Sequence, residues 1–268
     1  MPNHVRSIIE IKAPQERVEQ VLEQVSTYHP PEPRTGLDGS TVFVHKDNTG
    51  DWTTDKVGWW NEEKKEFSTR LEGVGSEVVV IGNEVPDDYE LDLTEAVTQY
   101  FDFNKIIPQP ENLFNGNLGA KEREMCKEQG IPNWYDWNIQ NWDTKWNSYD
   151  HVQHSDNIFE FSTAWSAPFA IFEKLAEMFP DVEFKIKYAD EDTGYNCGVV
   201  LIMDGECYIN EYDGGSKKAY ELAFELGGYE YNSELNLYQW SDDYPEGFRW
   251  NDETETYDWV EVNEEGEV

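Results

Sequence analysis

The sequence predicts an α+β fold in which helices pack on one face of a largely antiparallel sheet. Residues 182–188 alternate strictly between apolar and polar side chains, which is typical of a strand with one buried face. Two apolar runs flank Asp204-Gly205, a dipeptide that favours the tight turn of a β-hairpin. Residues 169–179 carry apolar side chains on one helical face and directly precede the alternating strand. The order helix, strand and hairpin therefore indicates a sheet covered by helices.

The N-terminal segment predicts a strand followed by a helix. Residues 5–11 are rich in β-branched side chains, and apolar residues then recur at the spacing of one helical face in residues 18–25. Prolines and glycines in residues 28–40 predict a connection, and residues 41–73 are interpreted only as irregular or β structure. The apolar run at 76–82, bounded by glycines, predicts a short buried strand.

The middle of the chain predicts strands on either side of one helix. Residues 100–107 form a strand-like run that ends before two prolines. Residues 118–129 predict a helix that Gly130 terminates. From residue 134 bulky aromatic side chains recur at strand-like spacing, so we expect a strand there and a second one at 159–163.

Two later helices have clear start and stop signals. Pro168 opens a helix that Pro180 ends, and Ser216 is a good N-cap for a helix that ends at Gly227-Gly228. Each of these helices has an apolar face. Both are therefore expected to pack against the sheet.

The last forty residues differ in composition from the rest. Thirteen acidic residues oppose a single base, Arg249, and nine aromatic residues are interleaved with them. Because a purely solubilising tail lacks aromatic residues, we expect a docked or partner-binding extension. The candidate partner-binding residues are Asp242, Asp243, Glu246, Trp250, Asp252, Glu253, Glu255, Asp258 and Trp259.

Charge and composition limit the partners. The formal net charge is -36 on 268 residues, which argues against binding to nucleic acid or to an anionic membrane, since both require a basic surface. The N-terminus has neither a signal peptide nor an apolar anchor, so we expect a cytoplasmic protein. Three cysteines without a paired pattern predict reduced thiols rather than disulfides.

Three sequence stretches resemble a known family. They are FDFNKIIPQP at 101–110, WYDWNIQNWDTKW at 134–146 and FEFSTAWSAPFAIFEKLAEMFP at 159–180. In order and spacing they resemble the Api-type proteins of phages and conjugative plasmids that carry a YubB ferredoxin-like domain. The resemblance covers about half of the chain, roughly residues 101–228. It implies a ferredoxin-like fold and a mobile genetic element, and it implies no established activity.

The resemblance also suggests a division of the chain and one departure from the family. We expect an N-terminal strand-helix region with an insertion at 1–100, the ferredoxin-like domain at 101–228 and the acidic aromatic extension at 229–268. The family's usual NWGTKW has Asp143 in place of glycine here. If that glycine has a positive φ angle, aspartate can adopt the same conformation at modest cost.

An aromatic cluster within these motifs has two interpretations. Its members are Trp142, Lys145, Trp146 and Trp165. Exposed tryptophans would make it a recognition pocket, because such residues dominate binding hot spots. Buried tryptophans would make it a core-packing signature between sheet and helices. The strand-like spacing favours the core.

Motifs for metal or cofactor chemistry are weak. His151 and His154 would ligate a divalent metal if they lay on a helix, but no third ligand is well placed, so a solvated turn is favoured. The segment Asp190 to Gly194 fails the calcium-loop pattern and predicts a loop between strands. No phosphate loop, nucleophile elbow or dinucleotide fingerprint occurs, and we expect neither an enzyme nor a cofactor.

Three functions follow from these observations. The first is inhibition of a host nucleic-acid-binding or defence protein, whose basic surface the acidic chain would occupy as a DNA mimic. The second is an accessory interaction or structural role in which acidity serves solubility or salt adaptation. The third is small-molecule binding, or an enzymatic activity, in a pocket of the ferredoxin-like domain. The charge and the resemblance favour the first.

Overall fold

A computed structural model describes residues 3–29, 32–35, 41–46, 52–53, 59–61, 66–68, 97–240 and 246–261. The chain forms two compact units, one made of residues 1–25 and 101–268 and the other of residues 26–100. The strand expected at 76–82 lies outside the described residues. Within them, no helix is both long and apolar enough to span a bilayer.

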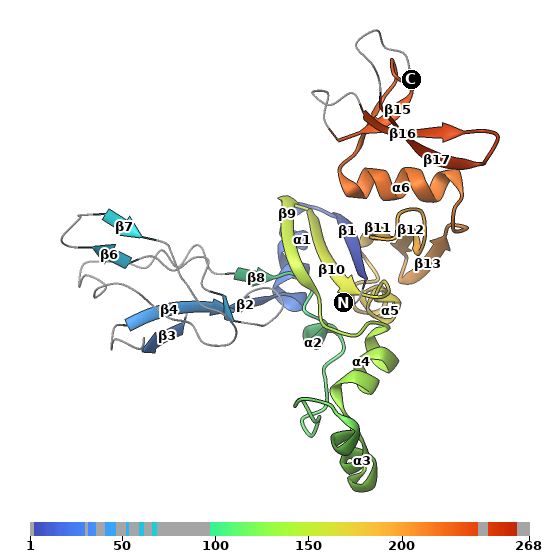
Figure 1. The fold of residues 1–268 in the computed structure, drawn as a ribbon. Helices are drawn as coiled ribbons and strands as arrows, with labels where there is room; N and C mark the ends of the chain where they lie inside the picture. The colour runs from blue at the N-terminus through green and yellow to red at the C-terminus, as the bar shows by residue number, and fades with distance from the viewer. Residues whose placement is uncertain are drawn as a thin grey trace. The chain divides into compact units, whose positions relative to one another are not determined.

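The first unit contains all the described helices and the two larger sheets (Figure 1). Its helices are α1 (Gln15–Val25), α2 (Phe103–Ile106), α3 (Ala120–Gln129), α4 (Trp134–Trp142), α5 (Phe169–Met178) and α6 (Lys217–Gly227). Its strands are β1 (His4–Lys12), β9 (Tyr149–Ser155), β10 (Ile158–Ala164), β11 (Glu183–Asp190), β12 (Cys197–Met203), β13 (Glu206–Glu211), β14 (Glu230–Asn232), β15 (Leu237–Gln239), β16 (Glu246–Asn251) and β17 (Thr256–Glu261).

The second unit contains short strands only among its described residues. They are β2 (Thr27–His29), β3 (Glu32–Thr35), β4 (Thr41–Lys46), β5 (Trp52–Thr53), β6 (Trp59–Asn61), β7 (Glu66–Ser68) and β8 (Val97–Gln99). Strand β2 pairs with β8, so the chain enters and leaves this unit on neighbouring strands. Residues 26–100 are therefore an insertion between α1 and α2.

The central sheet has six strands in the order β13-β12-β11-β1-β10-β9, and every neighbouring pair is antiparallel. Four of them, β11-β1-β10-β9, combine with α1 after β1 and α5 after β10 into the βαββαβ arrangement of a ferredoxin-like fold. The hairpin β12–β13 extends this sheet at one edge. The predicted α+β fold is confirmed.

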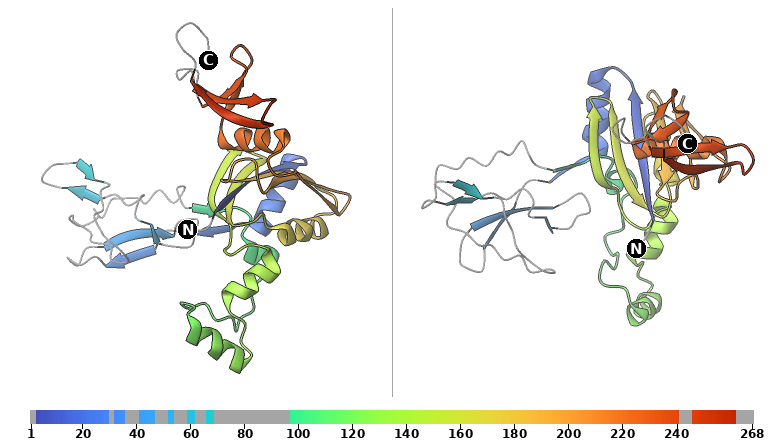
Figure 2. Two further views of the ribbon diagram at one scale, coloured as in Figure 1. Left: turned by 45° about the vertical axis from the view of Figure 1, so that its right-hand side comes forward. Right: turned by 45° about the horizontal axis from the view of Figure 1, so that its top comes forward.

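Helices lie on both faces of the sheet (Figure 2). On one face, α5 places Phe169 5.4 Å from the ring of Tyr188, and Phe179 lies 6.2 Å from the ring of Phe184. On the other face, α6 buries an apolar cluster against β11 and β12, formed by Ala189, Cys197, Ala219, Leu222 and Leu226. The sequence predicted helices on one face only, because it does not show that α6 follows a hairpin that returns the chain to the opposite side.

The acidic extension forms a second antiparallel sheet, β14-β15-β16-β17, which packs on the outer side of α6. Phe224 of α6 is buried beneath it and stacks on Phe248 at 4.8 Å. The rings of Tyr238 and Tyr257 each lie 5.0 Å from Phe224. Aromatic residues of the extension therefore dock it on the ferredoxin-like domain.

Two strand predictions were wrong. Residues 103–106 form the short helix α2, because the Asp102 side chain accepts a hydrogen bond from the backbone of Asn104 and caps the helix. Residues 134–142 form α4, whose Asn133 N-cap accepts from the backbone N–H of Asp136. In both cases a local Asx cap overrides the aromatic spacing.

The structure also divides the chain differently from the expected boundaries. Strand β1 lies in the middle of the central sheet, paired with β10 and β11. It therefore belongs with the ferredoxin-like domain rather than with a separate region ending at residue 100. The other turn and cap predictions agree with the structure: Asp204 and Gly205 have φ of 54° and 76°, and Ser216 caps α6.

Candidate functional site

The acidic hairpin, which we define as β16–β17 with its turn at 252–255, carries four aromatic rings on one face. Phe248 pairs with Trp259 and Trp250 pairs with Tyr257, so all four rings share one face. That face packs on α6 through Phe248 and Tyr257. The indole of Trp250 donates to Asp252 at 2.9 Å and lies 5.1 Å from Tyr257. Most of this aromatic surface therefore contacts the protein itself, although Trp259 remains 49% exposed.

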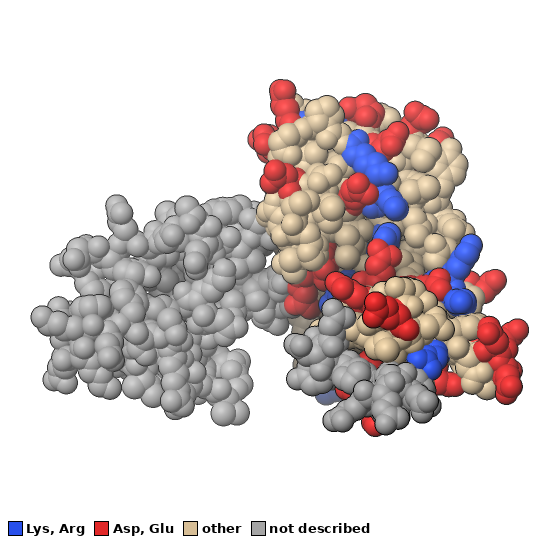
Figure 3. Space-filling view, turned by 90° about the horizontal axis from the view of Figure 1, so that it is seen from above, with Lys and Arg blue, Asp and Glu red and all other residues tan. Residues whose placement is uncertain are grey.

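The carboxylates of the acidic hairpin point to solvent. Asp252, Glu253, Glu255 and Asp258 are exposed, and Glu246 is half-buried. Among the described residues none of them forms an ion pair. In the view from above in Figure 3, acidic side chains lie at the margins and across the middle of the described surface, with Lys and Arg side chains among them. Asp242 and Asp243, two further candidates, lie outside the described residues.

The only base of the extension is turned into the fold. Arg249 donates from Nη2 to the carbonyl oxygen of Leu235 at 2.6 Å, which links β16 to the turn before β15. Asp258 pairs with Arg249 across the hairpin but accepts instead from Asn251, at 2.7 Å. Arg249 therefore forms no ion pair with the exposed carboxylates of the described hairpin.

Trp142 belongs to the core, as the sequence favoured. Its side chain is 1% exposed, and its indole N–H donates to the carbonyl oxygen of Ile107 at 2.9 Å. The rings of Phe103 and Trp137 lie 5.6 Å and 5.4 Å away. This tryptophan fixes α4 against α2.

The rest of the aromatic cluster is not core, which corrects the favoured interpretation. Trp146 is 36% exposed and Trp165 is 42% exposed. Lys145 lies between them, with its Nζ 4.4 Å from one ring centre and 4.8 Å from the other, distances at which a cation is attracted to an aromatic face. Trp165 also has a φ of 76°, a strained value for a bulky residue. Sequence spacing alone could not show that Trp142 is buried and Trp146 is exposed, because α4 ends between these two residues.

Asp143, for which the resemblance to Api-type proteins led us to expect glycine, adopts a positive φ, of 60°. It is the C-cap of α4, and its Oδ2 accepts from the backbone N–H of Ala170 at 2.8 Å. Pro168, the N-cap of α5, offers no side-chain cap, so Asp143 supplies the carboxylate at this helix N-terminus. A glycine at this position could not make this hydrogen bond.

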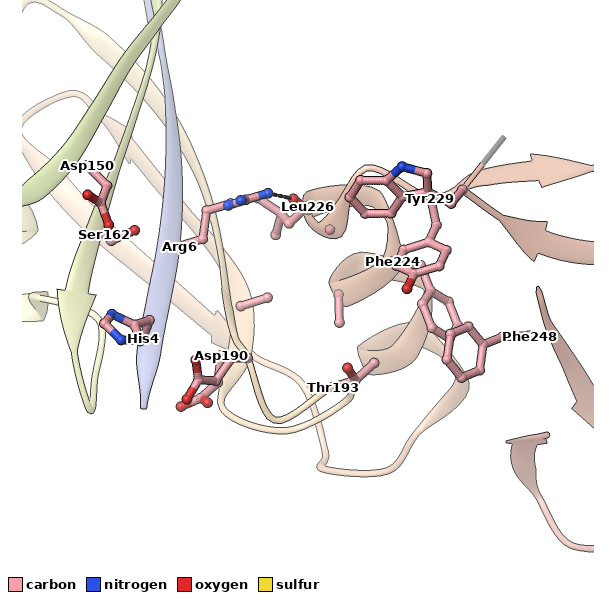
Figure 4. A pocket seen from close by; sticks show the side chains of 15 residues that line it. His4, Arg6, Asp150, Ser162, Asp190, Thr193, Phe224, Leu226, Tyr229 and Phe248 are labelled. Atoms are coloured by element: carbon pink, nitrogen blue, oxygen red, sulfur yellow. Dashed lines mark hydrogen bonds between the residues drawn. The ribbon is translucent and has the colours of Figure 1, made fainter. Parts of the chain in front are cut away.

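A cleft of about 460 Å³ lies between the central sheet, α6 and the extension. Figure 4 shows His4, Arg6, Asp150 and Ser162 on the side of the sheet, and Phe224, Tyr229 and Phe248 on the side of α6. Arg6 crosses between the two sides. Its Nε lies 2.9 Å from Oε1 of Glu160, and its Nη1 donates to the carbonyl oxygen of Leu226 in the last turn of α6.

Three carboxylates line this cleft, those of Asp150, Asp190 and Glu191. Asp190 is buried and accepts hydrogen bonds from Asn3 and Asn196 at 3.1 Å and 2.8 Å, and from the backbone of Asp192 at 2.9 Å. These bonds shape the loop that the sequence predicted between β11 and β12. Asp150 has a φ of 52° and lies where the register between β9 and β10 shifts.

Tyr149 has a buried phenol close to two of these carboxylates, those of Asp150 and Glu191. Burial raises the pKa of Tyr149 well above its usual value, and the nearby charges of Asp150 and Glu191 raise it further. The hydroxyl of Tyr149 donates to the carbonyl oxygen of Thr163 at 3.0 Å and lies 2.6 Å from Nδ1 of His4. Tyr149 therefore remains a neutral hydrogen-bonding group that holds His4 in place.

The two histidines considered as metal ligands lie on strand β9, neither on a helix nor in a turn. Nε2 of His154 lies 2.7 Å from Oε2 of Glu160, the side chain that also pairs with Arg6. In the part of the chain that the structure describes, no three His, Cys, Asp or Glu side chains are grouped as metal ligands.

Sequence reasoning missed the cleft because its residues come from four distant segments, near positions 4–6, 150–162, 189–193 and 223–248. No single motif contains them. The pairing of β1 with β10 and β11 brings the first three segments together, and the packing of α6 on the sheet and of the extension on α6 adds the fourth.

Comparison with protein families supports the fold. Residues 141–232 match the family described as the ferredoxin-like domain in Api92-like protein. This ferredoxin-like match covers about a third of the chain, from the end of α4 to β14, and thus β9 to β13 with α5 and α6. No curated protein and no solved structure matches the chain. Most of the extension, including Trp240 and the acidic hairpin, lies beyond the matched residues.

Proposed function

We propose that this protein is a non-enzymatic inhibitor, carried by a phage or another mobile element, that binds a basic surface of a host protein. The observation that carries the proposal is the acidic hairpin, in which five exposed carboxylates, that of Glu261 included, lie on a β-structure held to α6 by aromatic rings. A folded hairpin presents charge at fixed positions, which a disordered acidic tail does not.

Fixed carboxylates suit a protein surface that normally contacts phosphates. Positive side chains in a nucleic-acid channel gain the same long-range attraction from an acidic protein, which speeds association. A host nucleic-acid-binding or defence enzyme in the cytoplasm fits this chemistry. The mobile-element setting comes from the resemblance to Api-type proteins, and the charge of -36 is consistent with it.

The test is recovery of host proteins with the tagged full-length chain at low and moderate salt. One variant neutralises the acidic hairpin with Asp252→Asn, Glu253→Gln, Glu255→Gln and Asp258→Asn. A matched control neutralises four exposed acids elsewhere, with Glu16→Gln, Glu23→Gln, Glu124→Gln and Glu128→Gln. Both variants change the net charge equally.

Loss of one salt-sensitive partner with the hairpin variant alone supports the proposal, and competition by duplex DNA identifies the mimicked ligand. Equal loss with both variants shows that only net charge matters. That outcome favours the alternative in which acidity serves solubility or salt adaptation.

A further inference from the structure

Strand β13 forms one of the two edges of the central sheet (Figure 1). Its register with β12 runs without a shift from Glu206 to Glu211. The opposite edge strand, β9, is different, because its register with β10 shifts at two places, as it does at bulges. Bulges twist an edge strand and protect it from pairing with another chain. Strand β13 lacks that protection.

The hydrogen-bond pattern shows which backbone groups of β13 face outward. The N–H of Tyr212 donates at 2.9 Å to the carbonyl oxygen of Cys197, which the register places directly opposite. Hydrogen-bonded pairs alternate along an antiparallel ladder, so every second residue back from Tyr212 also faces β12. The residues between them turn their N–H and C=O groups to the outer edge, and these are Cys207, Ile209 and Glu211. Within the described chain, none of these outward groups has a hydrogen-bond partner.

The side chains of β13 are accessible as well. Tyr208 is 55% exposed and Ile209 is 40% exposed, although both lie on a strand of the central sheet. The strand contains neither proline nor lysine, the residues with which proteins commonly block an edge. A seventh strand would therefore cover these side chains and the free backbone groups together.

Acidic side chains flank this edge. Glu206 and Glu211 are the first and last residues of the strand, and both are exposed. A third carboxylate, that of Glu173 on α5, lies close, since partial burial and then this charge raise the pKa of the Cys207 thiol to about 11. Among the described residues, none of the three carboxylates forms an ion pair. The four central residues, CYIN, are uncharged at neutral pH, so the edge has an uncharged centre between acidic ends.

We propose that β13 binds an extended segment of a protein partner as a seventh, antiparallel strand, with apolar residues over the centre of β13 and basic residues at its ends. Main-chain hydrogen bonds to the three outward residues hold the segment, and its lysine or arginine side chains meet Glu206 and Glu211. A second copy of this chain fits less well, because it brings the same glutamates and a net charge of -36. The edge is separate from the acidic hairpin, so the inference does not rest on the proposed function.

The test uses the full-length, ¹⁵N-labelled protein and measures hydrogen exchange of individual amides by NMR. In the free protein we expect fast exchange at the three outward amides and slow exchange at Tyr208 and Asn210, which face β12. The probe is the capped hexapeptide Lys-Thr-Val-Val-Val-Lys, which places a lysine opposite Glu211 and another opposite Glu206, with β-branched residues between them. At saturation the outward amides should exchange about tenfold more slowly.

Three control peptides separate strand pairing from attraction between charges. N-methylation of the third residue removes an N–H that faces β13 in this register, so it should weaken binding about tenfold. N-methylation of the fourth residue removes an N–H that faces away and should leave binding nearly unchanged. Replacement of both lysines by glutamine should weaken binding about threefold or more, because two pairs of opposite charges are lost.

Two matched pairs of variants locate the binding on β13. Ile209→Lys is compared with Val152→Lys, since Val152 is 44% exposed on the other edge strand and the change in charge is the same. Glu211→Gln is compared with Glu23→Gln, since both remove one exposed carboxylate. We expect Ile209→Lys to weaken hexapeptide binding about fivefold or more and Glu211→Gln about twofold, with both controls nearly unchanged. The dispersion of the same spectra reports whether each variant is folded.

Equal binding of the two N-methylated peptides, or unchanged binding in folded Ile209→Lys, would overturn the proposal. So would slow exchange of the outward amides that increases with protein concentration in the absence of peptide, because a second copy would then be the occupant. The proposed function fails separately, because its test depends on the acidic hairpin. A chain that loses partner recovery through the hairpin variant but keeps hexapeptide binding retains the edge-strand inference.

Discussion

Phe224→Ala is expected to undock the extension. The Phe224 ring is buried, stacks on Phe248 at 23°, and lies within 5.0 Å of Tyr238 and Tyr257. Truncation of a buried phenylalanine costs about 3–5 kcal/mol. We expect about 4 kcal/mol or more, because aromatic pairing adds roughly 0.5–1.5 kcal/mol per pair beyond area burial. Five rings lose their partner, and four of them belong to the extension.

The consequence is local because this interface joins the extension to α6, whereas the central sheet has its own core. Urea unfolding of Phe224→Ala, followed by tryptophan fluorescence, should become two-step, with an early transition for the extension. Hydrogen exchange should accelerate in residues 230–261 and stay slow in β1 and β11. Phe224→Leu, which keeps apolar volume and loses the stacked ring, should cost about 1–1.5 kcal/mol.

The reasoning would be refuted by a Phe224→Ala protein that unfolds in one step within about 1 kcal/mol of the parent. Unchanged exchange in residues 230–261 would refute it as well. Either result would mean that contacts other than the Phe224 ring hold the extension.

Three further perturbations test the fold. Asp143→Ala keeps φ positive and removes the hydrogen bond to Ala170, so it should destabilise the protein by about 1–2 kcal/mol in thermal unfolding. Asp143→Gly should cost less, because glycine adopts a positive φ without strain. Gly198→Ala would place a Cβ 2.5 Å from the carbonyl oxygen of Asn210, so it should part β12 from β13 and cost about 1–3 kcal/mol; an unchanged melting temperature would contradict the close approach. Burial raises the pKa of Cys197 from 9.0 to about 11, so the native thiol should resist Ellman's reagent at pH 8. Rapid labelling of the native protein at pH 8 would contradict the burial of this thiol. Since the neutral thiol is favoured in the folded state, its contribution to the free energy of unfolding is complete below pH 9 and is lost as the pH rises towards 11.

The elements that sequence predicted well are those whose local signals agree with their tertiary setting. Strand β11 alternates apolar and polar residues, and its buried face does pack under α5. Helix α6 has Ser216 at its start and Gly228 in the left-handed conformation at its end. In these segments periodicity, caps and turns all indicate one structure, which is the usual property of a foldable sequence.

The wrong predictions share a cause. In residues 134–142 bulky side chains are frequent enough to fit either a strand or a helix, and the N-cap at Asn133 decides for the helix. Which tryptophan is buried then depends on where that helix ends. Trp142 lies inside its last turn and Trp146 lies beyond it, so their exposures differ although their spacing looked equivalent.

The candidate sites divide in the same way. The acidic hairpin could be predicted from composition, because its acidic residues lie close together in the sequence. The cleft was not, because its lining depends on strand pairing between residues far apart in the chain.

The position of β1 has a consequence for synthesis. Its two neighbours in the sheet, β10 and β11, begin at Ile158 and Glu183, so they leave the ribosome long after β1. At translation rates of about 5–20 residues per second, this N-terminal strand waits on the order of 10 s without either partner. During that interval its apolar residues Val5, Ile9 and Ile11, which are completely buried in the finished fold, have no sheet to cover them. Nascent chains stalled before residue 158 should therefore recruit chaperones, and chains released after residue 190 should no longer need them.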